Sequence, residues 1–290
     1  TTTVDFQLLA WPRIEGTVTE QGTGLPLTGT VTAGAFSTAT SPADGSYLLA
    51  VEPGTYDVTA RAPDHAASTQ AGVVAVGGTT TTLTFELRPM LTLLWDDVEG
   101  GNIGWTVQTV DPGGTPWSIV TDGAPNHAWF TSDPSETKDD RLAIGPFSLN
   151  EGTALSFDHH WAFEGTSTFY DGGVLEVSTN GTTWQDVLAV GGTFVEGGYT
   201  GTINGSSNPL DDRQAWTADS PGTVHTVVDL SALTGQSIHF RYRFGSDSSV
   251  GDTGWYVDNI LLQTATDAEP PMFYDGFESG TTDAWSSVLP

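Results

Sequence analysis

Hydrophobic and polar residues alternate along most of the chain, which is the pattern of strands with one buried face. The alternation is clear over residues 56–62, 154–164 and 238–244, where every second residue is apolar or aromatic. No stretch shows the 3.6-residue period of an amphipathic helix. The pattern therefore predicts an all-β protein whose sheets pack in pairs.

Turn residues divide this pattern into short strands and separate domains. Asp44-Gly45 and Asn180-Gly181 are strong hairpin signals, and Pro89-Met90 marks a boundary between two runs of strands. Pro270-Pro271 lies in a polar stretch that cannot extend a sheet. We predict four segments: an N-terminal strand or extension at 1–12, a small β-sandwich at 13–89, a larger jelly roll at 90–263, and a linker with a C-terminal tail at 264–290.

The first sandwich carries a recognisable set of motifs. Residues 14–18 (Ile-Glu-Gly-Thr-Val), 43–47 (Ala-Asp-Gly-Ser-Tyr) and 53–58 (Pro-Gly-Thr-Tyr-Asp-Val) resemble the carboxypeptidase regulatory-like domain. That family has a transthyretin-like β-sandwich fold. The resemblance implies a structural accessory domain without an active site.

The second run of strands carries another set of motifs. Residues 97–100 (Asp-Val-Glu-Gly), 171–173 (Asp-Gly-Gly), 241–244 (Arg-Tyr-Arg-Phe) and 254–260 (Gly-Trp-Tyr-Val-Asp-Asn-Ile) are similar to the jelly-roll domain of immune-inhibitor-A-type secreted metallopeptidases. That domain is in turn similar to MAM modules. The resemblance implies a concanavalin/MAM-like β-jelly roll, in which an early Glu and a late Asp help to bind a structural calcium ion.

A candidate calcium site lies in the same motifs. Asp96, Asp97 and Glu99 surround a tight turn, and Asp258 interrupts the apolar last strand. These carboxylates would gather at one edge of the jelly roll if the first and last strands are neighbours. Carboxylate and carbonyl oxygens suit calcium, whereas zinc prefers His or Cys. The alternative is that they are solvated acids on a very acidic protein.

Further acids occur in the loops of the second domain. Asp247 and Asp252 flank Gly251, and another group surrounds Lys138. The members of that group are Asp133, Glu136, Asp139 and Asp140. Either set could bind another ion, but acidic loops of this density are expected from the composition alone, so we favour the interpretation that they are solvated.

The charge of the chain restricts its partners and its location. Thirty-six acidic residues against eight basic ones give a formal net charge of -28. Nucleic acid and anionic membranes are disfavoured because both need clustered Lys and Arg. No apolar run approaches the length of a membrane span, so no membrane insertion is expected. The acidity suits a secreted protein that is free outside the cell or bound to the cell surface, and it is equally consistent with simple solubility.

Nothing in the sequence indicates catalysis. The absence of Cys excludes thiol nucleophiles, and no nucleophile elbow or phosphate-binding loop occurs. His159 and His160 are adjacent on a strand, where their side chains point to opposite faces and cannot share a zinc ion. We therefore interpret the chain as non-catalytic and expect any catalytic domain to lie upstream in the precursor.

Two tryptophans are candidates for stacking on a sugar ring. Trp117 and Trp129 lie in polar loops, whereas the other tryptophans mostly follow strand patterns next to Gly. Filling the core is the default role of a Trp. Trp117 and Trp129 are the two that a glycan array would test.

The tail repeats the motif that opens the second domain. Residues 273–280 followed by a Trp match residues 94–101 followed by Trp105. A detached strand also precedes the first sandwich. Either end of the chain could add to a sheet edge of another copy. The residues expected to make this contact are Val4, Phe6, Leu8, Phe273, Phe277 and Trp285.

The sequence is consistent with three functions. The first is a non-catalytic, calcium-stabilised accessory region of an exported bacterial protein, in particular a peptidase, serving stability, substrate docking or surface attachment. The second is an extracellular structural or adhesive protein that assembles head-to-tail by strand donation. The third and weakest is a carbohydrate-binding module. The expected partners are further copies of the chain, extracellular proteins or polysaccharides.

Overall fold

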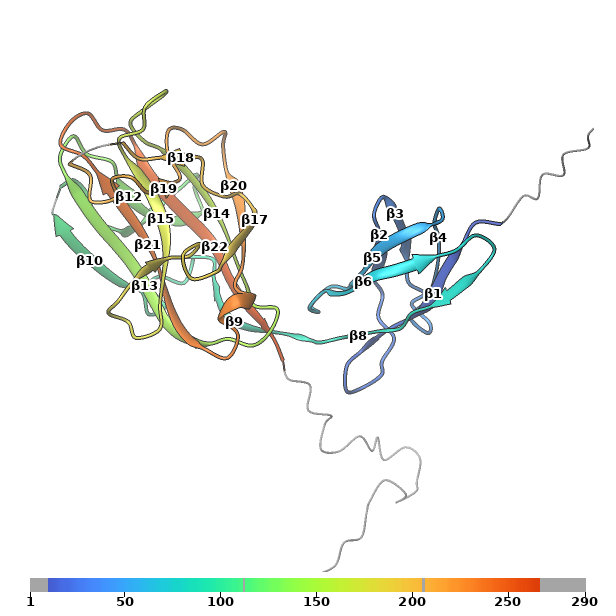
Figure 1. Ribbon diagram of the computed structural model, residues 1–290. Helices are drawn as coiled ribbons and strands as arrows, with labels where there is room; N and C mark the ends of the chain where they lie inside the picture. The colour runs from blue at the N-terminus through green and yellow to red at the C-terminus, as the bar shows by residue number, and fades with distance from the viewer. Residues whose placement is uncertain (1–9, 112, 205–206, 267–290) are drawn as a thin grey trace, which may run out of the picture. The chain divides into compact units, whose positions relative to one another are not determined.

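The computed structural model describes residues 10–111, 113–204 and 207–266, and this part of the chain consists almost entirely of strands (Figure 1). Its single helical turn is η1 (Ser231–Leu233). Among these residues no helix is long and apolar enough to cross a membrane. The chain divides into a smaller unit, Thr1–Met90 with Ala265–Pro290, and a larger unit, Leu91–Thr264.

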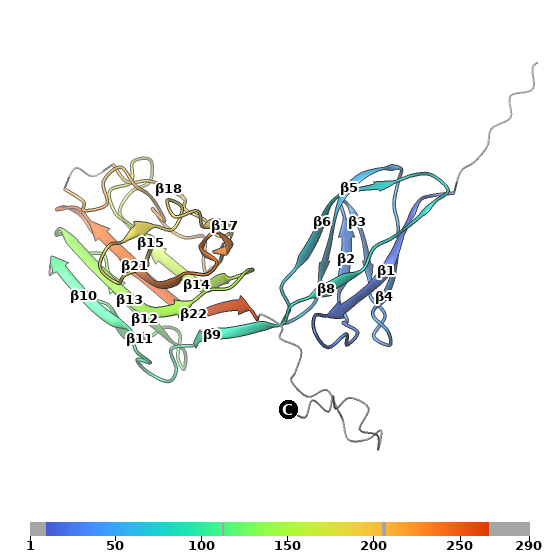
Figure 2. The ribbon, with the colours of Figure 1, turned by 60° about the horizontal axis from the view of Figure 1, so that its bottom comes forward.

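The smaller unit is a β-sandwich of two four-stranded sheets (Figure 2). Alternating residues of both sheets, such as Ile14, Val31 and Val58, are fully buried in one core. The first sheet contains β1 (Arg13–Glu20), β4 (Ser46–Ala50), β7 (Thr80–Thr82) and β8 (Phe85–Leu87). The second has the order β3 (Phe36–Ala39), β2 (Thr30–Ala33), β5 (Gly54–Arg61) and β6 (Ser68–Ala75).

The larger unit contains two large sheets, of five and seven strands, and a two-stranded sheet within a loop. The five-stranded sheet has the order β10 (Thr106–Asp111), β13 (Lys138–Ser148), β21 (Ser237–Ser246), β15 (Gly172–Ser178) and β16 (Gln185–Asp186). The seven-stranded sheet has the order β11 (Ser118–Thr121), β12 (His127–Ser132), β22 (Gly254–Ala265), β14 (Ala154–Ala162), β20 (Val224–Asp229) and β17 (Thr193–Glu196), with β9 (Met90–Asp96) paired to β22.

Aromatic side chains from both sheets fill the core of the larger unit. Tyr242 of the five-stranded sheet contacts Phe157 and Trp255 of the seven-stranded sheet at ring-centroid distances of 5.0 and 5.7 Å. His159 is buried beside them and accepts the indole N–H of Trp255, whereas His160 lies half-buried on the opposite face. The prediction that the two histidines point to opposite faces is confirmed.

The described residues of the glycine-rich stretch, 191–204 and 207–223, include β17, β18 (Gly201–Thr202) and β19 (Gln214–Ala215) and otherwise form a loop. Ile203, Leu210 and Ala215 of this loop pack on Val174 of β15, on the outer face of the five-stranded sheet. The loop therefore covers one half of that face and leaves the half near β10 and β13 accessible.

The all-β fold class is confirmed, with a small β-sandwich followed by a larger one. In strands such as β5 and β14 the buried residues are those that the two-residue period of the sequence places on one face.

Candidate functional site

The structure places two of the predicted calcium ligands in different environments. Asp96 is only 3% exposed, and its two carboxylate oxygens accept the N–H of Val98 at 2.9 Å and the indole N–H of Trp105 at 2.7 Å. Asp97 is exposed and accepts the N–H of Glu99 at 3.2 Å. Asp96 thus serves as a buried acceptor that fixes Trp105 in the core.

Glu99 and Asp258 lie in one neighbourhood at the outer face of the seven-stranded sheet. Glu99 accepts hydrogen bonds from the backbone N–H and Nδ1 of His127, and Asp258 accepts one from Asn126 at 3.0 Å. Burial raises the pKa of Asp258, and the negative charges of Asp158 and Glu99 raise it further. Among the described residues, however, no three of the four predicted ligands bring their carboxylate oxygens within 4.8 Å of one another.

The prediction that Trp117 and Trp129 stack on sugars is wrong. Their side chains are 3% and 2% exposed. Trp117 packs against Trp255 with ring centroids 5.4 Å apart, and Trp129 packs against Trp105 at 6.2 Å. Both rings fill the core, which is the default role of a large aromatic side chain.

The predicted assembly residues, Val4, Phe6, Leu8, Phe273, Phe277 and Trp285, lie outside the described residues. Self-association through these positions therefore stays a prediction.

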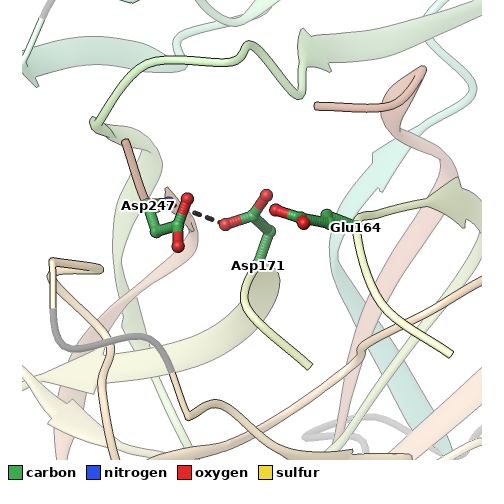
Figure 3. A group of neighbouring side chains, drawn as sticks. All are labelled: Glu164, Asp171 and Asp247. Carbon is green, nitrogen blue, oxygen red and sulfur yellow. Dashed lines mark hydrogen bonds between the residues drawn. The ribbon is translucent and has the colours of Figure 1, made fainter. Parts of the chain in front are cut away.

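A different set of acids comes together where strands of both sheets end. Glu164 follows β14, Asp171 directly precedes β15, and Asp247 directly follows β21. One carboxylate oxygen from each residue lies within 4.8 Å of those of the other two. Figure 3 shows the carboxylate of Asp171 between those of Glu164 and Asp247. We call these three residues, together with Asp133, the acid cluster.

Asp133 connects the acid cluster to the seven-stranded sheet. It follows β12, and its Oδ2 accepts the backbone N–H groups of Glu164 and Asp252, each at 3.2 Å. Its other oxygen, Oδ1, is buried and accepts no hydrogen bond from any described residue. The interaction with Asp133 raises the pKa of Asp171, whereas the hydrogen bond with Asp171 lowers the pKa of Asp133. The cluster therefore joins loops from both sheets.

The interior of the acid cluster lacks partners for its oxygens. Asp171 is 0% exposed, and its Oδ1 accepts the N–H of Asp247 at 2.7 Å. Its Oδ2, Oδ1 of Asp133 and Oε2 of Glu164 are buried without a hydrogen-bond partner in the described part of the chain. An unpaired buried acceptor costs about 1–3 kcal/mol, and a charged one costs more. Three such oxygens at one place form a site that a bound cation or a shared proton would stabilise.

The pKa values of the acid cluster also reflect its burial and the repulsion between its carboxylates. Burial and the nearby charge of Asp133 raise the pKa of Asp171 to about 9. Burial also raises the pKa of Asp133 to about 6. Burial and the charge of Asp247 raise the pKa of Glu164. The carboxylates repel one another in a poorly solvated site, so they gain protons unless a cation replaces those protons.

Two glycines follow Asp171 at positions where a larger residue would not fit. Gly172 and Gly173 follow Asp171, and a Cβ on Gly173 would lie 2.4 Å from the ring of Trp255. A Cβ on Gly172 would lie 2.6 Å from the carbonyl oxygen of Trp216. Gly173 thus makes room for Trp255 in the core, and Gly172 lets the segment at Ala215 and Trp216 lie close to β15.

The loop acids that the sequence indicated as solvated have three different environments. Asp133 is only 3% exposed, so that interpretation is wrong for this residue. It is wrong for Asp139 and Asp140 too, because Asp139 pairs with Arg141 and Arg243, and Asp140 pairs with the buried Lys138 at 3.1 Å. Glu136 and Asp252 are exposed, as expected. Asp171 and Glu164 were not considered as ligands, although Asp171-Gly172-Gly173 at a strand start was a usable signal.

The donor set of the acid cluster suits calcium among common metals. All of its side-chain donors are carboxylates, on loops that can supply backbone carbonyls and water as further ligands. Calcium accepts six to eight oxygen ligands in flexible geometry, about 2.3–2.6 Å away. Magnesium demands a tighter octahedron and keeps several waters, and zinc prefers nitrogen or sulfur donors.

Comparisons with known proteins identify the smaller unit. Residues 13–88 match the family model of the carboxypeptidase regulatory-like domain, so this resemblance is confirmed for that segment. No curated protein matches the chain.

Several solved structures are similar to the chain at low identity. The K3 cleaved adhesin domain of Lys-gingipain from Porphyromonas gingivalis W83 is 15% identical over 61% of this chain and 99% of that chain, with a TM-score of 0.37. TmCBM61, solved in complex with β-1,4-galactotriose, is 13% identical over 58% of this chain and 93% of that chain, with a TM-score of 0.35. At such TM-scores these likenesses assign no function.

Proposed function

We propose that the chain is a non-catalytic, calcium-stabilised accessory region of an exported bacterial protein, with a MAM-like jelly roll as its larger unit. The observation that carries the proposal is the acid cluster, in which the fully buried Asp171 directs an unpartnered oxygen toward neighbouring carboxylates. In this proposal calcium neutralises the cluster and fixes the loops that join the two sheets. The bound ion has a structural role.

The composition and the smaller unit are consistent with an exported accessory region. Extracellular modules bind calcium with dissociation constants of about 10⁻⁴–10⁻³ M, a range in which the ion is saturating only outside the cell. A formal net charge of -28 increases the attraction for cations. The carboxypeptidase regulatory-like domain at 13–88 supports attachment to a larger protein, for which we propose a peptidase. The region then serves stability, substrate docking or attachment to an extracellular protein or polysaccharide.

Thermal unfolding with and without calcium tests this function. We expect calcium at about 100 times its Kd to stabilise the larger unit by about 2.7 kcal/mol. For a unit of this size that corresponds to a rise in Tm of roughly 5–10 °C relative to the protein in EDTA. All tryptophans except Trp11 and Trp285 lie in Leu91–Thr264, so intrinsic fluorescence reports this unit. Magnesium at the same concentration is the control, and a Tm that is unchanged by EDTA would contradict the proposal.

A further inference from the structure

The few basic residues of the chain are unevenly distributed. The sequence has only eight Lys and Arg in total. Half of them lie on the outer face of the five-stranded sheet: Arg141 on β13, Arg241 and Arg243 on β21, and Arg213 on the loop that covers β15. They face outward because the intervening Leu142, Phe240 and Tyr242 are buried in the core. We call these four residues the arginine cluster.

Three carboxylates form ion pairs with the arginine cluster. Asp139 pairs with Arg141 at 2.7 Å and with Arg243 at 2.8 Å. Glu176 pairs with Arg213, Arg241 and Arg243, and Asp186 pairs with Arg213 at 2.7 Å. The four guanidinium groups and these three carboxylates form one network of ion pairs, and Asp111 of β10, the cross-strand partner of Asp139, adds a fourth carboxylate to the same face. This outer face therefore holds half of the Lys and Arg residues of a strongly acidic protein.

Two members of the arginine cluster, Arg141 and Arg241, line a hollow of about 220 Å³ on the same face. Its floor includes Ala143 of β13, which is paired with Thr106 of β10 on one side and Arg241 of β21 on the other. The small side chain of Ala143 leaves space between longer neighbours. The walls include Gln108, Arg141, Trp184, His239 and Arg241. The loop that covers β15 leaves this part of the face accessible.

Several hydrogen-bond donors at the hollow are not used within the protein. The guanidinium of Arg241 stacks over the ring of Trp184 at 4.3 Å, and its Nε and Nη2 bind Glu176. Nη1 of Arg241 and the indole N–H of Trp184 have no hydrogen-bond partner in the described ranges. Nδ1 of His239, a donor or an acceptor depending on the tautomer, is buried and has no partner there either. Nη1 of Arg141 donates to Oε1 of Gln108 at 3.3 Å and makes no other hydrogen bond within the described residues.

We propose that this hollow binds a carboxylate group on a sugar ring, as found in oligosaccharides that contain uronic acids. Guanidinium groups bind carboxylates with two parallel hydrogen bonds, and the fixed stack on Trp184 pre-orients Arg241 for this geometry. The partly exposed indole offers an apolar surface and an N–H donor beside the charge, which matches the mixed surface of a sugar. A flexible acidic peptide would interact with the guanidinium groups but would not need the apolar surface of the indole.

This inference gives the proposed docking role a ligand class but does not depend on calcium. Calorimetric titration of β-1,4-linked triglucuronic acid, in buffer containing calcium, tests it. Cellotriose is the neutral sugar of the same linkage, and hexaglutamate is the acidic peptide. We expect binding of the uronic acid alone, weakened by added salt. Equal binding of cellotriose or hexaglutamate, or no binding of the uronic acid, would overturn the inference.

Two variants with the same change in charge locate the site. Arg141→Gln removes a guanidinium at the hollow while Asp139 keeps Arg243 as its partner, so the fold is retained. We expect it to weaken binding at least tenfold. Arg61→Gln, at an exposed position in the smaller unit, should leave binding unchanged. Equal binding by both variants would refute the assignment. Because calcium-dependent unfolding is measured separately, failure of either proposal is distinguishable from failure of the other.

Discussion

Asp171→Asn is expected to raise the Tm of the calcium-free protein at pH 8 and to abolish most of the rise that calcium produces. Asp171 is fully buried, and its pKa of about 9 shows that its ionised form is strongly disfavoured. An amide keeps the acceptor that binds the N–H of Asp247 but carries no charge. We expect a gain on the order of 2 kcal/mol without calcium, since one pKa unit corresponds to about 1.4 kcal/mol.

A matched substitution controls for loss of charge alone. Asp211→Asn also removes one carboxylate from the larger unit, but Asp211 is exposed and its side chain has no hydrogen bond within the described residues. Fluorescence-monitored unfolding should show the same Tm for this variant and the wild type, with and without calcium. If Asp171→Asn kept the full response to calcium, the acid cluster would not be the binding site.

The Tm of the wild-type protein in EDTA is expected to fall as the pH rises from 5 to 9. The pKa values of Asp133 and Asp171 in the folded protein, about 6 and about 9, lie above the reference value of 3.8. Protons therefore bind the folded state more tightly. The resulting stabilisation is complete below pH 3.8 and is lost as the pH passes through about 6 and then about 9. One such group changes the free energy of unfolding by about 1.4 kcal/mol per pH unit.

Saturating calcium should remove most of this dependence on pH, because the ion replaces the protons and binds more tightly when the carboxylates are ionised. Unfolding measured from pH 5 to 9, in EDTA and in calcium, checks this expectation. Asp171→Asn should show a shallower dependence in EDTA than the wild type. A Tm in EDTA that rises steadily over this range would contradict the sign of the effect.

The sequence predicts the fold well because strand periodicity and turn chemistry are local signals. Asn180-Gly181 lies in the hairpin between β15 and β16, and the apolar alternation of residues 238–244 matches the buried face of β21. The motifs at 14–18, 43–47 and 53–58 identified the family of the smaller unit. Each of these predictions needs only a short window of sequence.

The acid cluster could not be predicted in the same way because it depends on how distant strands meet. Asp133 and Asp247 are both in acidic loops, and nothing local distinguishes the buried Asp133 from the exposed Asp252. Only the pairing of β12 with β22 and of β15 with β21 brings these strand ends to one place. The sequence instead favoured Asp96, whose carboxylate is engaged by Trp105. The same limit applies to Trp117, which directly precedes β11, and to Trp129, which lies on β12, because their burial depends on packing against distant strands.

The acid cluster also explains why a structural ion would matter for this fold. Its residues end or begin β12, β14, β15 and β21, so one ion would hold strands from both sheets at the same end of the sandwich. The rest of the interface between the sheets is aromatic and needs no ion. Calcium would therefore act mainly on the loops at this end.

Calorimetric titration of calcium into the wild type, Asp171→Asn and Glu99→Gln tests the central claim most directly. The acid cluster predicts a binding event that is present in the wild type, lost in Asp171→Asn and retained in Glu99→Gln, because Glu99 belongs to the separate group near Asp258. An isotherm that is unchanged by Asp171→Asn, or that is lost only in Glu99→Gln, would contradict the claim and place the ion at the site near Asp258.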